Sequence, residues 1–120
     1  MANEITIIIS GTLSNGSLAD TFSDSDQITQ TTQGASQGVV SVTTSEADLS
    51  LGSVASGLII LKNLDATNYV KYGPKSGGAM IEFGRLEPGQ VNLVRLPSGV
   101  TLRWIANSAT CKVLFKAWET

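Results

Sequence analysis

Apolar residues recur at every second position in many short stretches of this chain, which is the period of a half-buried β-strand. The alternation is clearest in residues 100–107 and 111–119, where each strand has one apolar face. Residues 58–64 are almost continuously apolar, as is typical of a strand covered on both faces. No stretch shows a convincing helical period. The expected strands are residues 4–10, 17–23, 39–44, 58–64, 68–72, 79–86, 91–96, 100–107 and 111–119.

Turn signals separate these strands. Asn15-Gly16 predicts a hairpin turn because both residue types tolerate positive φ. Pro88-Gly89 fits the centre of a type II turn, and residues 97–99 mark a second tight turn. Residues 73–78 combine a proline with three glycines and predict a flexible loop. Many short strands at this spacing predict an all-β fold, a β-sandwich, and within that class a jelly roll.

The composition changes at Gly57. The preceding residues are rich in Ser, Thr and Gln, whereas those that follow are more apolar. We therefore expect one domain overall, in which residues 1–56 form polar N-terminal strands or an arm and residues 57–120 form the apolar core of the sandwich. Residues 24–38 are compatible with a loop, an arm, or a strand that becomes ordered only on a neighbour.

The charges are divided along the chain. No Lys or Arg precedes Lys62, so the first 61 residues carry six acidic groups, and the rest carries eight basic groups against four acidic ones. Charged residues make up 15% of the chain, below the roughly 25% usual for soluble domains. Opposed surfaces of this kind can complement each other between copies or dock on a charged scaffold. The first half is equally compatible with a merely solvated polar sheet.

The sequence contains few residues that could support catalysis or bind a cofactor. The chain has no histidine, which removes the commonest general base and metal ligand, and its single cysteine, Cys111, lies in an apolar alternation typical of the core. The acidic residues around Asp24 do not match a calcium loop, and the glycines of residues 73–78 do not match a phosphate loop. We therefore expect no enzyme activity, no cofactor and no metal.

The start of the chain lacks the basic residues of a signal peptide, and no apolar run is long enough to cross a membrane. We expect synthesis in a cytoplasm and no membrane partner. A nucleic-acid partner is disfavoured because the pI is about 4.9 and the acidic half would repel phosphate.

Three segments carry a resemblance. The sequences LKNLDATNYV at residues 61–70, RLEPGQ at 85–90 and VTLRWIAN at 100–107 are similar to those of small virion structural proteins of tailed bacteriophages. That group includes capsid decoration, or cement, proteins and small head or tail accessory proteins. The similarity spans roughly residues 57–118.

The resemblance implies a non-catalytic β-sandwich subunit that is present in many copies in the virion and is made in the cytoplasm of the bacterial host. It also implies a homo-oligomer, often a trimer, that binds the major capsid protein or other virion proteins. The expected function is therefore a decoration protein that stabilises the phage head. The alternatives are a tail, neck or fibre-base component and, from a different class, a carbohydrate-binding β-sandwich.

The candidate interface residues follow from charge, aromatic character and strand position. Residues 24–38 are expected to act as a docking strand, the two tyrosines to pack between subunits, and Trp118 to anchor an edge together with neighbouring lysines. The candidates are Asp24, Asp26, Tyr69, Lys71, Tyr72, Arg95, Arg103, Lys112, Lys116 and Trp118.

Overall fold

The computed structural model describes residues 3–120, which form β-strands and connecting loops with no helix. The chain divides into two compact units, one containing the N-terminal residues to Gln33 together with Thr120, and the other spanning Gly34–Glu119. The boundary therefore lies after Gln33 and not near residue 56. Residues 34–56 belong to the second unit because their strands are hydrogen-bonded into its sheets.

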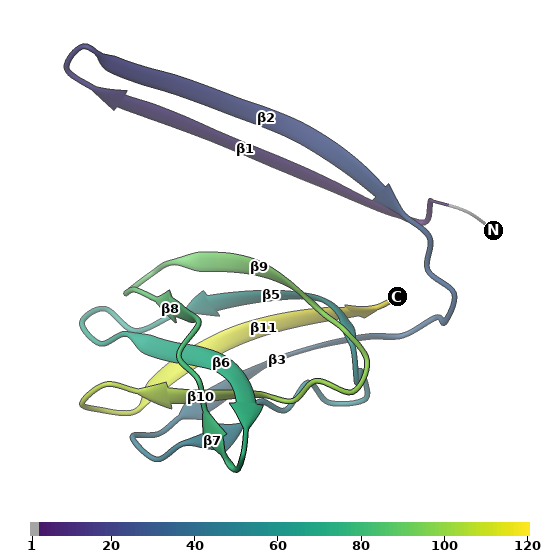
Figure 1. The fold of residues 1–120 in the computed structure, drawn as a ribbon, viewed down its shortest axis with the longest axis vertical. Helices are drawn as coiled ribbons and strands as arrows, with labels where there is room; N and C mark the ends of the chain where they lie inside the picture. The colour runs from purple at the N-terminus through teal and green to yellow at the C-terminus, as the bar shows by residue number, and fades with distance from the viewer. Residues whose placement is uncertain (1–2) are drawn as a thin grey trace. The chain divides into compact units, whose positions relative to one another are not determined.

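The first unit is a long two-stranded ribbon (Figure 1). Strands β1 (Ile5–Asn15) and β2 (Leu18–Ile28) pair antiparallel along their whole length. Gly16 has a φ of 59°, which confirms the predicted turn at Asn15-Gly16. Both strands run further than residues 4–10 and 17–23 because their polar ends remain paired.

The second unit is a sandwich of two sheets, which confirms the predicted fold class (Figure 1). One sheet has the strand order β3 (Ala35–Val42), β11 (Cys111–Glu119), β5 (Gly57–Asn63) and β9 (Val91–Leu96). The other sheet contains β4 (Ala47–Asp48), β10 (Leu102–Ala106) and β6 (Val70–Ser76), with β7 (Ala79–Met80) and β8 (Gly84–Leu86) both paired to β6.

The strand pairs of the sandwich are nested along the chain. β3 pairs with β11, β4 with β10, β5 with β9, and β6 with β8, so each pair encloses the next. The pairs also alternate between the two sheets. A single antiparallel ribbon wound around the core has this order.

The core lies between the two sheets and is built mainly from the inward residues of β3, β5, β6, β8, β9, β10 and β11. Ile59, Leu61 and Val113 are fully buried, and Trp104 is 4% exposed. Burying one large aliphatic side chain contributes about 1.5–3 kcal/mol. Cys111 is also fully buried, as predicted. Burial raises the pKa of its thiol, and the negative charge of Asp65 adds to that effect.

A buried asparagine joins three parts of the sandwich. The Asn63 side-chain amide donates to the carbonyl oxygens of Asn68 and Leu86 at 2.8 and 3.1 Å, and its oxygen accepts from the Asp65 N–H at 2.9 Å. Asp65 in turn accepts hydrogen bonds from the backbone N–H groups of Asn68 and Thr67, and these bonds lower its pKa. The distinctive segment at residues 61–70 therefore holds β5, β6 and β8 in place.

Two expected elements differ in the structure. Residues 73–76 continue β6 and are not a loop, because β10 pairs with this strand as far as Pro74. The expected strand at residues 79–86 is split into β7 and β8. Between them, Ile81 and Phe83 donate backbone hydrogen bonds to Pro74 and Tyr72. The segment therefore passes close to Gly73, where an added Cβ would collide with the Ile81 carbonyl oxygen.

We expect Gly73→Ala to destabilise the sandwich by about 1–3 kcal/mol, because the colliding atom belongs to paired backbone and has little room to move. Urea unfolding measures the change in free energy. Gly11→Ala is the matched control, since a Cβ at Gly11 contacts no other atom within 4 Å. Equal stability of the two variants would contradict the close approach at Gly73.

Candidate functional site

One sheet of the sandwich exposes an outer face that carries basic and apolar side chains. We call it the basic sheet face. It comprises the residues of β3, β11, β5 and β9 that alternate with the core positions and are matched by the strand registers. They are Ala35, Gln37, Val39, Ser41, Leu58, Ile60, Lys62, Val91, Leu93, Arg95, Lys112, Leu114, Lys116 and Trp118.

Four cations lie on this face and no acid accompanies them. Lys62, Arg95, Lys112 and Lys116 come from three different strands, and cross-strand register brings them onto one surface. Within residues 34–119 none of the four has a carboxylate within 4.0 Å. Lys112 has one polar contact, 3.4 Å from its Nζ to the hydroxyl of Ser41. This face therefore has a positive charge that no ion pair within the second unit neutralises.

Apolar residues lie between the cations. Leu114 stands between Lys112 and Lys116 along β11 and is 37% exposed, while Val39 on the neighbouring strand is 52% exposed. Val91 on β9 is 57% exposed. Exposed apolar groups in a contiguous sheet face mark surfaces that bind another molecule.

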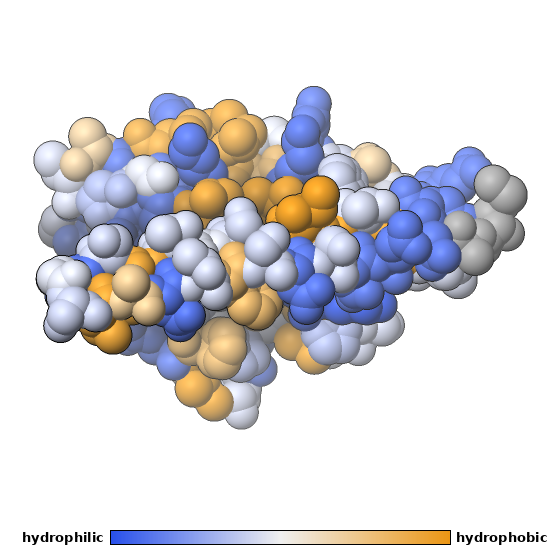
Figure 2. Space-filling view, turned by 90° about the horizontal axis from the view of Figure 1, so that it is seen from above, coloured by the Kyte–Doolittle hydropathy of each residue, from blue (hydrophilic) through white to orange (hydrophobic). Residues whose placement is uncertain are grey.

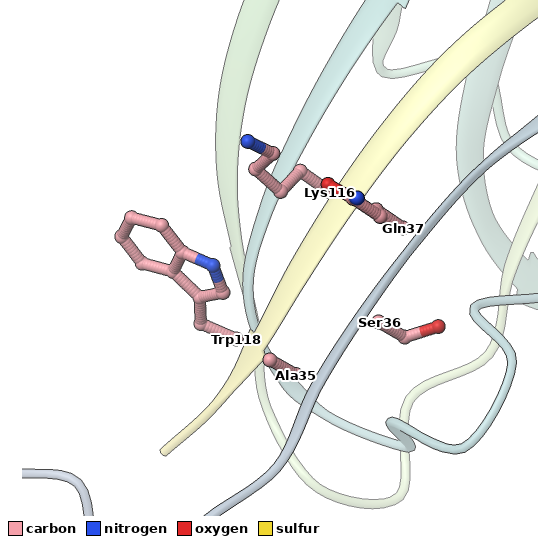
Figure 3. A pocket seen from close by; sticks show the side chains of 5 residues that line it. All are labelled: Ala35, Ser36, Gln37, Lys116 and Trp118. Carbon is pink, nitrogen blue, oxygen red and sulfur yellow. The ribbon is translucent and has the colours of Figure 1, made fainter.

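A shallow depression of about 300 Å³ lies at one end of this face, lined by Ala35, Ser36, Gln37, Lys116 and Trp118. Figure 3 shows the Trp118 indole and the Lys116 amine projecting from β11 on the same side, whereas Ser36 points the other way. Trp118 therefore faces outward, as the alternation predicts, and is partly buried.

The other sheet is different because three of its four bases, all except Lys75, have acidic partners in the same unit. Arg103 donates at 2.8 Å to both Glu46 and Asp48, which raises its pKa. Lys71 lies 3.7 Å from Glu82. Arg85 contacts Glu82 and Glu87 and stacks 4.0 Å above the Tyr69 ring.

The hairpin has two unlike faces, because directly paired residues project to the same side. One face consists mostly of Ser and Thr side chains and also contains the apolar residue Ile8. The other combines apolar groups with three carboxylates, and we call it the acidic hairpin face. It comprises Ile5, Ile7, Ile9, Gly11, Leu13, Asn15, Leu18, Asp20, Phe22, Asp24, Asp26 and Ile28.

The apolar part of the acidic hairpin face is accessible. Phe22 is 59% exposed and Ile9 is 50% exposed. A depression of about 310 Å³ lies beside them and is also lined by Asp24 and Asp26. In the space-filling view, orange apolar side chains likewise interrupt the polar surface of the chain (Figure 2).

The carboxylates of β2 have only local partners among the bonds that the structure shows. Asp20, Asp24 and Asp26 each accept a hydrogen bond from the N–H of the following residue at 2.8–2.9 Å. With Glu4, they give residues 3–33 four acids and no base. Residues 34–119 carry eight bases against six acids.

The structure corrects one expected interface residue, Tyr72, and gives the surroundings of three others. Tyr72 is 4% exposed and accepts a hydrogen bond from Asn92, so it belongs to the core. Arg103 and Lys71 are engaged by acids of their own chain. Tyr69 is partly buried under Arg85 and does not share a surface with Tyr72.

The expected docking strand at residues 24–38 is also corrected, because its two ends belong to different units: residues 24–28 end β2, and residues 35–38 begin β3. Asp24 and Asp26 lie on the acidic hairpin face. Arg95, Lys112, Lys116 and Trp118 share the basic sheet face.

Sequence reasoning missed Phe22 and Lys62 as surface residues. The period-two pattern Leu18, Asp20, Phe22, Asp24 and Asp26 was available as a signal for the hairpin face. No local pattern marks Lys62, since only the pairing of β5 with β11 and β9 places it among the other bases.

Comparison with protein-family models, curated proteins and solved structures finds no match for this chain. Within residues 3–120 no three His, Cys, Asp or Glu side chains are grouped so as to hold a metal ion. The same residues contain no helix with the length and apolar content needed to cross a membrane.

Bases on the two sheets should differ in how much they contribute to stability. We expect Arg103→Met to lower the melting temperature by a few degrees because it leaves Glu46 and Asp48 without their partner. Lys116→Met should leave it almost unchanged, since no acid within residues 34–119 forms an ion pair with Lys116. Calorimetry on both variants measures the difference, and equal losses would show that Lys116 also has a structural role.

Proposed function

We propose that this chain is a non-catalytic structural subunit that acts by docking onto protein surfaces, as a decoration protein on the head of a tailed bacteriophage. The observation that carries the proposal is the β1–β2 hairpin. It is a ribbon of only two strands, 11 residues each, with an exposed apolar face. Two strands alone are marginally stable in water, so such a ribbon gains stability from a partner that covers it.

The unpaired outer edges of β1 and β2 support the same proposal. Within residues 3–120 each strand of the ribbon pairs only with the other. Exposed edges of this kind are templates for pairing with another chain. The Ser- and Thr-rich face opposite the acidic hairpin face, together with the carboxylates of β2, would keep the ribbon soluble until it docks.

Support for the phage head comes from the resemblance in residues 61–70, 85–90 and 100–107. In the structure, two of these segments meet around Asn63, whose backbone bonds Gly89 and Gln90. The similar residues therefore build the fold of the sandwich. The similarity in these residues therefore supports a shared fold. It does not identify the docking surfaces, which are inferred from exposure and charge.

The nested strand pairs support the finer description of the sandwich as a jelly roll. Counting β7 and β8 as one interrupted strand, the sandwich strands lie in the orders 1-8-3-6 and 2-7-4-5. These are the orders that a jelly roll has, and this fold is frequent in viral capsid proteins.

A decoration protein stabilises a particle by binding the assembled shell and not its separated subunits. The gain follows mass action and reaches about 2.7 kcal/mol per site when the free protein is at 100 times its Kd. No chemical step is needed, which suits a chain without histidine.

The same docking surfaces would serve a tail, neck or fibre-base component, and the location of the protein on purified virions separates these roles. A carbohydrate-binding role has one supporting observation, the depression beside Trp118. A glycan array probed with the native protein and with Trp118→Ala tests it, and absence of binding would reject it.

We expect the protein to raise the melting temperature of depleted phage particles. Ile9→Thr should weaken this effect because Ile9 lies on the acidic hairpin face, whereas Ile8→Thr should retain it because Ile8 lies on the opposite face. Differential scanning calorimetry of particles at saturating protein measures both. An unchanged melting temperature with the native protein would contradict the proposed function.

A further inference from the structure

We infer that the acidic hairpin face of one copy docks on the basic sheet face of a second copy, so that two molecules exchange their hairpins. The inference rests on the proposed role of the hairpin as a docking element, and it identifies the hairpin's partner. It follows from charge, from the spacing of side chains along the strands, and from the area of the two faces.

The charges of the two faces are complementary. Asp20, Asp24 and Asp26 lie on the hairpin face, and residues 3–33 contain no base that could pair with them. Lys112 and Lys116 lie on the sheet face, and no acid of residues 34–119 forms an ion pair with them. On the opposite sheet, Lys71, Arg85 and Arg103 pair with acids of their own unit, and Lys75 is the one base there without such a pair. The basic sheet face, which has four unpaired bases, therefore suits an acidic partner better.

The patterns along the strands also match. The hairpin presents Asp20, Phe22 and Asp24 at alternate positions of β2, and the sheet presents Lys112, Leu114 and Lys116 at alternate positions of β11. In both strands the outer charges are four residues apart, which is about 13 Å in an extended chain. When the two strands face each other, Phe22 meets Leu114 while each carboxylate meets an ammonium group.

The sizes of the faces favour exchange between two copies. A ribbon of two strands and 11 residues is about 10 Å wide and 37 Å long. One hairpin on one sheet would bury only a few hundred Å² on each side. Reciprocal docking uses two hairpins and two sheet faces, roughly 1,500 Å² in total, which is the size of a standard specific interface. A two-fold pair is also the commonest closed assembly.

The test uses two full-length charge-reversal variants. The hairpin variant carries Asp20→Lys and Asp24→Lys, and the sheet variant carries Lys112→Glu and Lys116→Glu. In either variant alone, like charges face each other, so we expect the Kd of self-association to rise roughly tenfold or more. In an equimolar mixture, both contacts of a mixed pair regain opposite charges, so the dimer should return. Light scattering after size exclusion measures the mass of each sample.

A control variant carries Ser23→Lys and Ser25→Lys, which add the same two lysines to β2 on the opposite face. It should dimerise like the native protein. Circular dichroism and thermal unfolding of every variant verify that the sandwich is folded. Dimerisation of the native protein should also weaken as the salt concentration rises above about 0.15 M, where the Debye length is near 8 Å.

A native protein that stays monomeric at high concentration would overturn the inference, as would a mixture of the two variants that stays monomeric. In the first case, loss of particle binding by the hairpin variant would show that the hairpin docks on the shell, and the proposed function would stand. Conversely, dimerisation could be restored in the mixture as expected while the native protein fails to stabilise particles. That result would support the inference and contradict the decoration role.

Discussion

A strand in a two-stranded ribbon has a neighbour on only one side, and this constraint governs what the N-terminal hairpin can do. Its 11 residue pairs satisfy half of the backbone groups of each strand and leave an apolar face with no second layer in its own unit. The sandwich has no such deficit, since its inward residues bury one another between two sheets. The two units of this chain therefore differ: the second buries its inward apolar residues between its own sheets, whereas the first leaves an apolar face exposed.

The distribution of charge follows the same division. Acids accompany bases on the outer side of the sheet that contains β10 and β6, where Arg103 and Arg85 are held by carboxylates. The outer side of the other sheet carries bases alone, and the hairpin carries acids alone. A chain with only 15% charged residues thus keeps most of its uncompensated charges on two surfaces of opposite sign. Surfaces of this kind determine which partner binds and in which orientation more than they determine how tightly it binds.

Period-two alternation made much of this fold predictable. The expected strands at residues 91–96 and 111–119 coincide with β9 and β11, and the turns at Asn15-Gly16 and Pro88-Gly89 are confirmed by the positive φ of their glycines. Tyr69 and Tyr72 are three positions apart, so alternation alone would have placed them on opposite faces.

Other features depend on contacts between distant residues and could not be predicted locally. Pro74 and the nearby glycines suggest a loop, yet pairing with β10 extends β6 through Gly73 and Pro74. Gly73 is needed because another segment passes beside it. The change of composition at Gly57 concealed the true boundary after Gln33, because β3 is polar on its outer side although it pairs with β11. The basic sheet face joins paired residues that lie far apart in the sequence, from 29 positions between Lys62 and Val91 to 83 positions between Ala35 and Trp118, and only the register reveals it.

The central claim is that the hairpin depends on a partner for its stability while the sandwich does not. Amide hydrogen exchange at two protein concentrations tests this most directly. At low concentration, the amides of β1 and β2 should exchange much faster than those of β5 and β11, and at high concentration the hairpin amides alone should become strongly protected. Equal and concentration-independent protection of the hairpin would show that it is stable by itself and would contradict the account.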